Sequence, residues 1–201
     1  MNQNYIATPF NLTVMKTYIK KIAGILVVSA LLLIPAISFS QTMDTPYIDK
    51  FTNDTTLFTT DQMIAHYKNE NQGIRREINV YFAKYKDQVT LHFIVKLPTD
   101  EYRRFSISAG TTILVKLADN TLLTLSTTND AIPAAGETKN GYNCWQTDII
   151  MALSSGDLEK LSLSAMTAIR IEVSPDNIDF DCLPNINAPV KNMISLITAA
   201  K

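Results

Sequence analysis

The stretch INVYFAKYKDQVTLHFIVKL, from Ile78 to Leu97, carries the clearest pattern in the chain. Apolar residues recur at every second position on both sides of Lys86 and Asp87, which is the period of a half-buried strand. A turn at these two residues matches apolar with apolar positions: Phe82 faces Leu91, Val80 faces Phe93 and, on the other face, Tyr81 faces His92. Because turn and alternation agree, the stretch predicts an antiparallel hairpin in this register.

Two further hairpins are expected downstream. Residues 111–128 turn at Asp119-Asn120, residue types that tolerate left-handed backbone. Both faces of this hairpin carry Leu or Ile, which favours a hairpin covered on both sides. The segments MTAIRIEVS and NIDFDC form the other hairpin, with its loop at residues 174–177. That loop would place Arg170 opposite Asp181 and Glu172 opposite Asp179, all facing outward, with Cys182 on the inner face.

The remaining segments complete a mainly β pattern. Residues 47–60 indicate one or two strands, and residues 142–153 another. Residues 61–72 do not decide between a helical turn and a loop, whereas residues 129–140, with Pro133 and Gly136, indicate a long loop.

Two helices are expected near the end of the chain. Ser154 and Asp157 form a capping-box pattern that opens a short helix. Residues 187–200 form an amphipathic C-terminal helix, with one apolar face made of Val190, Met193, Ile194 and Ile197. The predicted fold is therefore an antiparallel β-sandwich or partly open barrel with a short helix and a C-terminal amphipathic helix.

The first forty residues are typical of a secretory signal peptide. Three lysines precede the apolar run from Ile22 to Ile34, and small residues follow at Ser38 and Ser40. The residues before Met15 are expected to be an extended n-region or the result of a start codon chosen upstream in error. The alternative to a cleaved signal peptide is an uncleaved N-terminal anchor. Residues 41–201 are then a single exported domain, periplasmic or secreted, with no stable membrane span after cleavage.

Charge argues against one class of partner. The chain has a formal net charge of −1, and no Asp or Glu but three Lys lie in the first forty residues, so the remainder carries −4. Phosphate backbones are bound by clustered Lys and Arg. Arg75-Arg76 and Arg103-Arg104 are only isolated doublets, which argues against nucleic acid.

Few residues are candidates for chemistry. With only His66 and His92, the chain offers no zinc motif, and the acids around Asp179 lack the glycine and glutamate of an EF-hand loop. No metal or cofactor is expected. The two cysteines, Cys144 and Cys182, are compatible with one disulfide, with two unpaired thiols, or with a thiol nucleophile beside a histidine.

Aromatic residues supply the candidate binding site. Tyr142 and Trp145 follow the 129–140 loop, and loops on rigid scaffolds often carry function. Tyr81 and His92 lie side by side on the outward face of the central hairpin, where we expect a solvated histidine.

Several segments support a resemblance to other proteins: IDKFTNDTT at residues 48–56, GTTILVKLADNTLLTL, AIRIEV and IDFD. In these segments, which span most of residues 47–200, the chain resembles a loose group of small exported β-rich proteins of Gram-negative bacteria. The resemblance implies an exported β domain and transfers no catalytic residue.

Three functions follow as hypotheses. The first is a non-enzymatic domain that binds a protein, a glycan or a cell-envelope component. The second is a hydrolase that uses Cys144 or Cys182 with a histidine. The third is a structural subunit of an envelope assembly.

Overall fold

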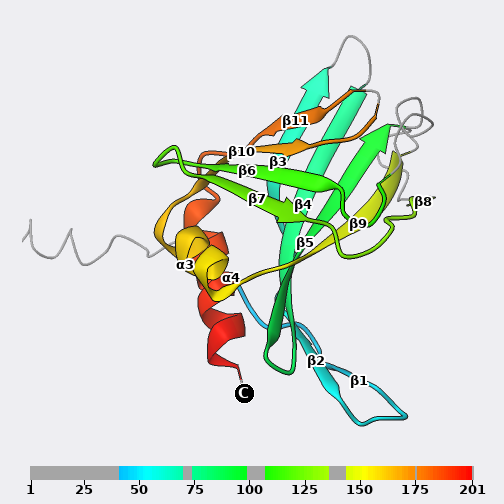
Figure 1. Cartoon of the computed structure of the whole chain (residues 1–201), viewed down its shortest axis with the longest axis vertical. Helices are drawn as coiled ribbons and strands as arrows, with labels where there is room; N and C mark the ends of the chain where they lie inside the picture. Colours follow the sequence, from blue (N-terminus) through cyan, green and yellow to red (C-terminus); the bar gives the residue numbers. More distant parts are fainter. Residues whose placement is uncertain (1–40, 70–73, 99–106, 136–143, 175, 201) are drawn as a thin grey trace, which may run out of the picture. The chain divides into compact units, whose positions relative to one another are not determined.

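The computed structural model describes residues 41–69, 74–98, 107–135, 144–174 and 176–200. They belong to one of the two units into which the chain divides, residues 39–201. The expected signal peptide and Tyr142 lie outside the described residues. Two antiparallel sheets and two helices make up the described part, which confirms the predicted mainly β fold (Figure 1).

The larger sheet has seven strands in the order β1-β2-β4-β5-β9-β8, and β3 pairs with β4 next to β2. The strands are β1 (Tyr47–Ile48), β2 (Thr55–Phe58), β3 (Gln62–Asn69), β4 (Ile74–Tyr85), β5 (Gln88–Pro98), β8 (Ala134–Ala135) and β9 (Cys144–Ala152). The hairpin of β4 and β5 has the predicted register, with Tyr81 opposite His92 and Phe82 opposite Leu91. Lys86 turns the chain with a φ of 54°.

The smaller sheet has the order β11-β10-β6-β7. Its strands are β6 (Thr112–Leu117), β7 (Leu122–Ser126), β10 (Met166–Ile171) and β11 (Ile178–Asp181). The predicted turn between β6 and β7 is confirmed, with Asn120 at a φ of 66°. The expectation that this hairpin is covered on both sides is wrong, because Leu122 on its outer face is 55% exposed.

The register of β10 and β11 differs from the prediction by two residues. Arg170 lies opposite Asp179, and Asp181 lies opposite Ala168. The pairing starts at Ile171 and Ile178, so the connection is longer than the expected loop at residues 174–177. A shift of two residues keeps each side chain on its face, which is why the alternation fits both registers.

For residues 61–72 the sequence left a helical turn and a loop open, but most of this segment forms strand β3. Its pairing with β4 is irregular between Met63 and Ala65, where a bulge inserts Ile64. Ile64 and Ala65 are both fully buried although they are adjacent. The bulge thus breaks the period-two pattern by which a strand is recognised.

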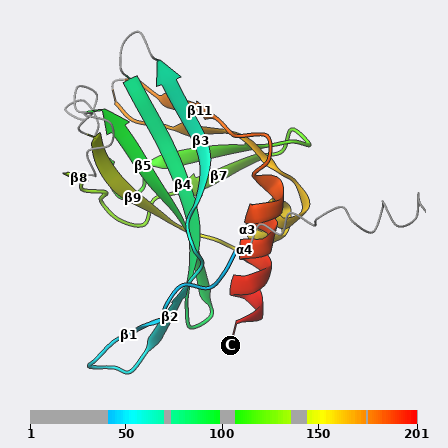
Figure 2. The same ribbon diagram turned by 180° about the vertical axis from the view of Figure 1, so that it is seen from behind.

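The two helices lie together at one end of the sheets (Figure 2). Helix α3 (Ser155–Leu163) starts at the predicted capping box of Ser154 and Asp157. Helix α4 (Asn187–Ala199) buries Pro189 and the four predicted residues Val190, Met193, Ile194 and Ile197. Lys84 on β4 donates from Nζ to the carbonyl oxygen of Ala200, 2.6 Å away, and so ties the end of α4 to the larger sheet.

The sheets meet at two corners through single bridges, Ala65 to Cys182 and Thr127 to Met151. Single bridges do not close the sheets into a barrel, so the architecture is a sandwich with joined corners. Side chains from the inner faces fill its centre, among them Phe82, Phe93, Ile113, Ile149 and Ile171, all fully buried.

Candidate functional site

A polar cluster lies on the outer face of the larger sheet, around His92. Its Nε2 is 2.9 Å from Oγ1 of Thr90, and its Nδ1 is 3.1 Å from Oδ2 of Asp148 on β9. The hydroxyl of Tyr81 donates to the same Oδ2 over 2.7 Å. The Tyr81 and His92 rings stack with centroids 4.3 Å apart. Strands β4, β5 and β9 are thus joined by one hydrogen-bonded unit, here called the His92 cluster.

The His92 cluster is more buried than the sequence suggested. His92 is only 7% exposed, so the expectation of a solvated histidine is wrong. The reason is that Tyr81 covers the ring on one side while Thr90 and Asp148 occupy its two nitrogens. Burial, together with the hydrogen bond to Asp148, raises the pKa of Tyr81 far above its usual value, so the phenol stays protonated and keeps donating.

The connectivity of Thr90, His92 and Asp148 is that of a hydroxyl, an imidazole and a carboxylate in series. The hydroxyl of Thr90, on strand β5, also lies 3.5 Å from the carbonyl oxygen of Ala83. A nucleophile normally works beside backbone N–H groups that stabilise an oxyanion. On β4 and β5 the backbone N–H groups take part in the hydrogen bonds between the strands of the sheet. The hydrogen bonds of the His92 cluster join β4, β5 and β9.

The two cysteines are not joined in the structure. Cys182 has a free thiol and follows β11, where it bridges Ala65 on β3. Cys144 is the first residue of β9, and its side chain is outside the described part. Strands β4 and β5 separate β9 from β3, the strand that Cys182 bridges. Because neighbouring strands are ~4.8 Å apart, the backbones of Cys144 and Cys182 are separated by much more than the ~7 Å that a disulfide can span. Of the three alternatives that the sequence left open for the cysteines, the Cys144–Cys182 disulfide is therefore not formed in this structure.

Cys182 is also a poor nucleophile. Burial, and secondarily the charge of Asp181, raise the pKa of its thiol to about 12. The reactive form of cysteine is the thiolate. His92 contacts Thr90 and Asp148 rather than this thiol.

Of the loop candidates, only one side chain is described. Trp145 on β9 is half-buried, opposite Leu97 of β5 and Ala135 of β8. Ile132, in the described part of the 129–140 loop, is 83% exposed. Tyr142 cannot be placed beside them, since residues 136–143 are outside the description.

A second surface, which the sequence did not indicate, is an arm made of residues 47–58. It contains β1, β2 and their connection, and both views show its tip projecting away from the helices (Figures 1 and 2). Phe51 at the tip is 97% exposed, Tyr47 59% and Ile48 57%. We call these three residues the arm tip. The sequence shows that two of these residues are aromatic. Their exposure follows from the fold, in which no other described element covers β1.

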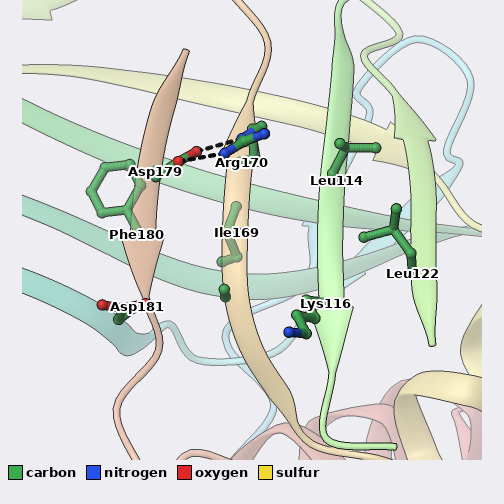
Figure 3. Close-up of a pocket in the computed structure, with 9 residues that line it drawn as sticks. Leu114, Lys116, Leu122, Ile169, Arg170, Asp179, Phe180 and Asp181 are labelled. Carbon is green, nitrogen blue, oxygen red and sulfur yellow. Dashed lines mark hydrogen bonds and ion pairs between the residues drawn. The ribbon is translucent and has the colours of Figure 1, made fainter. Parts of the chain in front are cut away.

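A third surface is a groove on the outer face of the smaller sheet (Figure 3). Its volume is about 300 Å³, and its outward-facing lining residues include Leu114, Lys116, Leu122, Ala168, Arg170 and Asp181. On one side Arg170 donates to both carboxylate oxygens of Asp179, each over 2.7 Å. We call it the β10 groove. Its position depends on the register of β10 and β11, which the sequence misplaced.

Comparison of the chain with protein-family models, curated proteins and solved structures finds no match. The resemblance to exported β-rich proteins thus stays a prediction. Within the described ranges, no group of three His, Cys, Asp or Glu residues is arranged to hold a metal ion. No helix formed by the described residues is both long and apolar enough to cross a membrane.

Proposed function

We propose that this chain is a non-enzymatic binding domain that recognises a protein partner through its arm. The observation that carries the proposal is the arm tip, where Phe51, Tyr47 and Ile48 present more than half of their surface to solvent. Burying one such large apolar side chain contributes ~1.5–3 kcal/mol. Contiguous exposed apolar groups of this kind often mark interaction sites.

The arm tip is held in shape before any partner binds. The carboxylate of Asp49 accepts from the backbone N–H of Phe51 over 2.7 Å and of Thr52 over 2.9 Å. The backbone N–H of Asp49 donates to the carbonyl oxygen of Asp54 over 2.9 Å, closing the turn. A preordered contact surface loses less entropy on binding.

The arm is also anchored to the neighbouring hairpin. Asp54 accepts a hydrogen bond from the hydroxyl of Tyr85, and Nζ of Lys86 lies 3.3 Å from the same carboxylate. Both residues belong to the turn region of β4 and β5. These contacts hold the base of the arm against the turn of the β4–β5 hairpin.

A protein fits the arm tip better than a glycan does. Of the three arm-tip residues only Tyr47 has a side-chain hydrogen-bonding group, whereas binding several sugar hydroxyls needs several such groups. The thiol-hydrolase alternative has less support, because the raised pKa of Cys182 keeps that thiol protonated at neutral pH. We further propose that the domain works in the periplasm or outside the cell, as the N-terminal sequence suggests.

Site-specific photo-crosslinking tests the proposal. A photoreactive phenylalanine analogue replaces Phe51 in the full chain, expressed in its own organism, and the matched control carries the analogue at Lys160 on the exposed side of α3. We expect an adduct of discrete mass from position 51 alone. Adding Ile48→Ser should reduce its yield. Equal adducts from both positions, or none from position 51, would refute the role of the arm.

A further inference from the structure

The β10 groove has a floor made by a small residue between larger ones. Ala168 lies opposite Lys116 on one side and Asp181 on the other. Leu122 continues the same row, and Arg170 and Leu114 form the next row (Figure 3). The missing side-chain volume at Ala168 creates the hollow. A volume of about 300 Å³ is at the lower limit of small-molecule pockets, which favours an inserted side chain over a whole ligand.

Two opposite charges flank this hollow without a partner. The side chains of Lys116 and Asp181 make no hydrogen bond or ion pair with another described residue, whereas Arg170 and Asp179 neutralise each other. An inserted group should therefore be apolar, with a positive charge on one side for Asp181 and a negative charge on the other for Lys116.

The arm tip has this composition. Phe51 is preceded by Asp49 and Lys50, so an apolar ring stands next to one charge of each sign. Lys50 is exposed, and its side chain has no partner among the described residues. The arm and the groove lie on different sheets, and Figures 1 and 2 show them apart. Contact between them would thus join two molecules.

We infer that the arm tip of one molecule occupies the β10 groove of a second copy of the chain. This inference rests on the proposed binding role of the arm and names its partner. Phe51 lies over Ala168, and the aliphatic side chains of Leu114 and Leu122 flank its ring on the side of β6 and β7. Lys50 faces Asp181, and the carboxylate of Asp49 faces Lys116.

Such a contact is heterologous, because two different surfaces of the same chain meet. Each copy keeps one free arm and one free groove, so addition continues until a ring closes or a filament forms. The chain is then a structural subunit that assembles with itself, the third of the functions that the sequence left open.

The test uses two variants at exposed positions, Phe51→Ser on the arm and Leu122→Asp in the groove, expressed from the full chain and purified. Sedimentation velocity over a concentration series measures their mass. We expect the unmodified protein to form species larger than a dimer as concentration rises, and each variant to stay a monomer. Ile132→Ser removes another exposed apolar residue, which belongs neither to the arm nor to the lining of the β10 groove, and should assemble like the unmodified protein.

Mixing the two variants gives the deciding result. The Phe51→Ser chain keeps its groove and the Leu122→Asp chain keeps its arm, so an equal mixture should form a one-to-one dimer and nothing larger. Ala168→Gln, which fills the hollow, replaces Leu122→Asp if that variant loses the thermal unfolding transition. A monomeric mixture, assembly of either variant alone, or an unmodified protein that stays monomeric overturns the inference. In the last case a crosslink from position 51 to another protein still supports the arm as a binding element.

Discussion

Tyr81 and His92 share one oxygen atom: the Tyr81 hydroxyl and Nδ1 of His92 lie 2.7 Å and 3.1 Å from Oδ2 of Asp148. Their rings stack at an interplanar angle of 24°. The hairpin register that sets Tyr81 opposite His92 was readable from the sequence. Asp148 comes from β9, more than fifty residues later. A local pairing and a distant strand thus combine into one hydrogen-bonded unit.

Removing the shared acceptor should destabilise the domain. Asp148→Ala leaves the Tyr81 hydroxyl and His92 Nδ1 without their partner, and such a loss costs about 1–3 kcal/mol. The side chain of Asp148 is 40% exposed, so water can replace part of the contact and we expect the lower half of this range. Urea denaturation measures the change. Asp176→Ala removes an exposed carboxylate elsewhere and should leave stability unchanged; equal effects of the two variants would contradict the structural role of the cluster.

The raised pKa of Tyr81 predicts a loss of stability at high pH. The unfolded chain releases the phenol proton near pH 10, whereas the folded chain retains it because of burial and the bond to Asp148. Stability is therefore unaffected by this group below pH 10 and falls above it, by about 1.4 kcal/mol per pH unit. Urea titrations at pH 9 and pH 11 measure the slope. Tyr81→Phe should remove this contribution, so identical slopes in both proteins would show that Tyr81 titrates normally.

The thiol of Cys182 should react slowly in the folded protein. With its pKa raised to about 12, the thiolate is scarce at pH 8, whereas an ordinary cysteine has a pKa near 8.5. We expect alkylation of Cys182 to be at least roughly 100-fold slower in the folded than in the denatured chain. Peptide mapping by mass spectrometry separates it from Cys144. Failure to alkylate Cys182 in the denatured, unreduced chain would instead reveal a disulfide.

The register of β10 and β11 can be checked by double-mutant cycles. Arg170 contacts Asp179 through two hydrogen bonds, so Arg170→Ala and Asp179→Ala should be non-additive in unfolding free energy. The matched cycle with Asp181→Ala should be additive, because Asp181 lies opposite Ala168. Coupling to Asp181 without coupling to Asp179 would restore the register that the sequence suggested.

Local patterns predicted much of the fold because a few neighbouring residues carry them. The β4 and β5 hairpin follows from alternation around one turn, and α3 follows from the reciprocal bonds of Ser154 and Asp157. The buried face of α4 follows from helical spacing. Strand β3 was not predicted, because the bulge at Ile64 interrupts the alternation of apolar and polar residues. The register of β10 and β11 was predicted wrongly, because a shift of two residues leaves every side chain on the same face and so fits the sequence pattern equally well.

The candidate sites depended on the tertiary structure throughout. The sequence by itself determined that Tyr81 and His92 are neighbours on an outward face, that residues 47–60 contain strands, and that Asp119 and Asn120 turn a hairpin. It did not determine which outward faces are covered. Asp148 and Thr90 close around His92, while Phe51, Tyr47 and Leu122 remain open to solvent. Exposure is set by which strands and loops come together across the fold, and residues distant in the chain decide that.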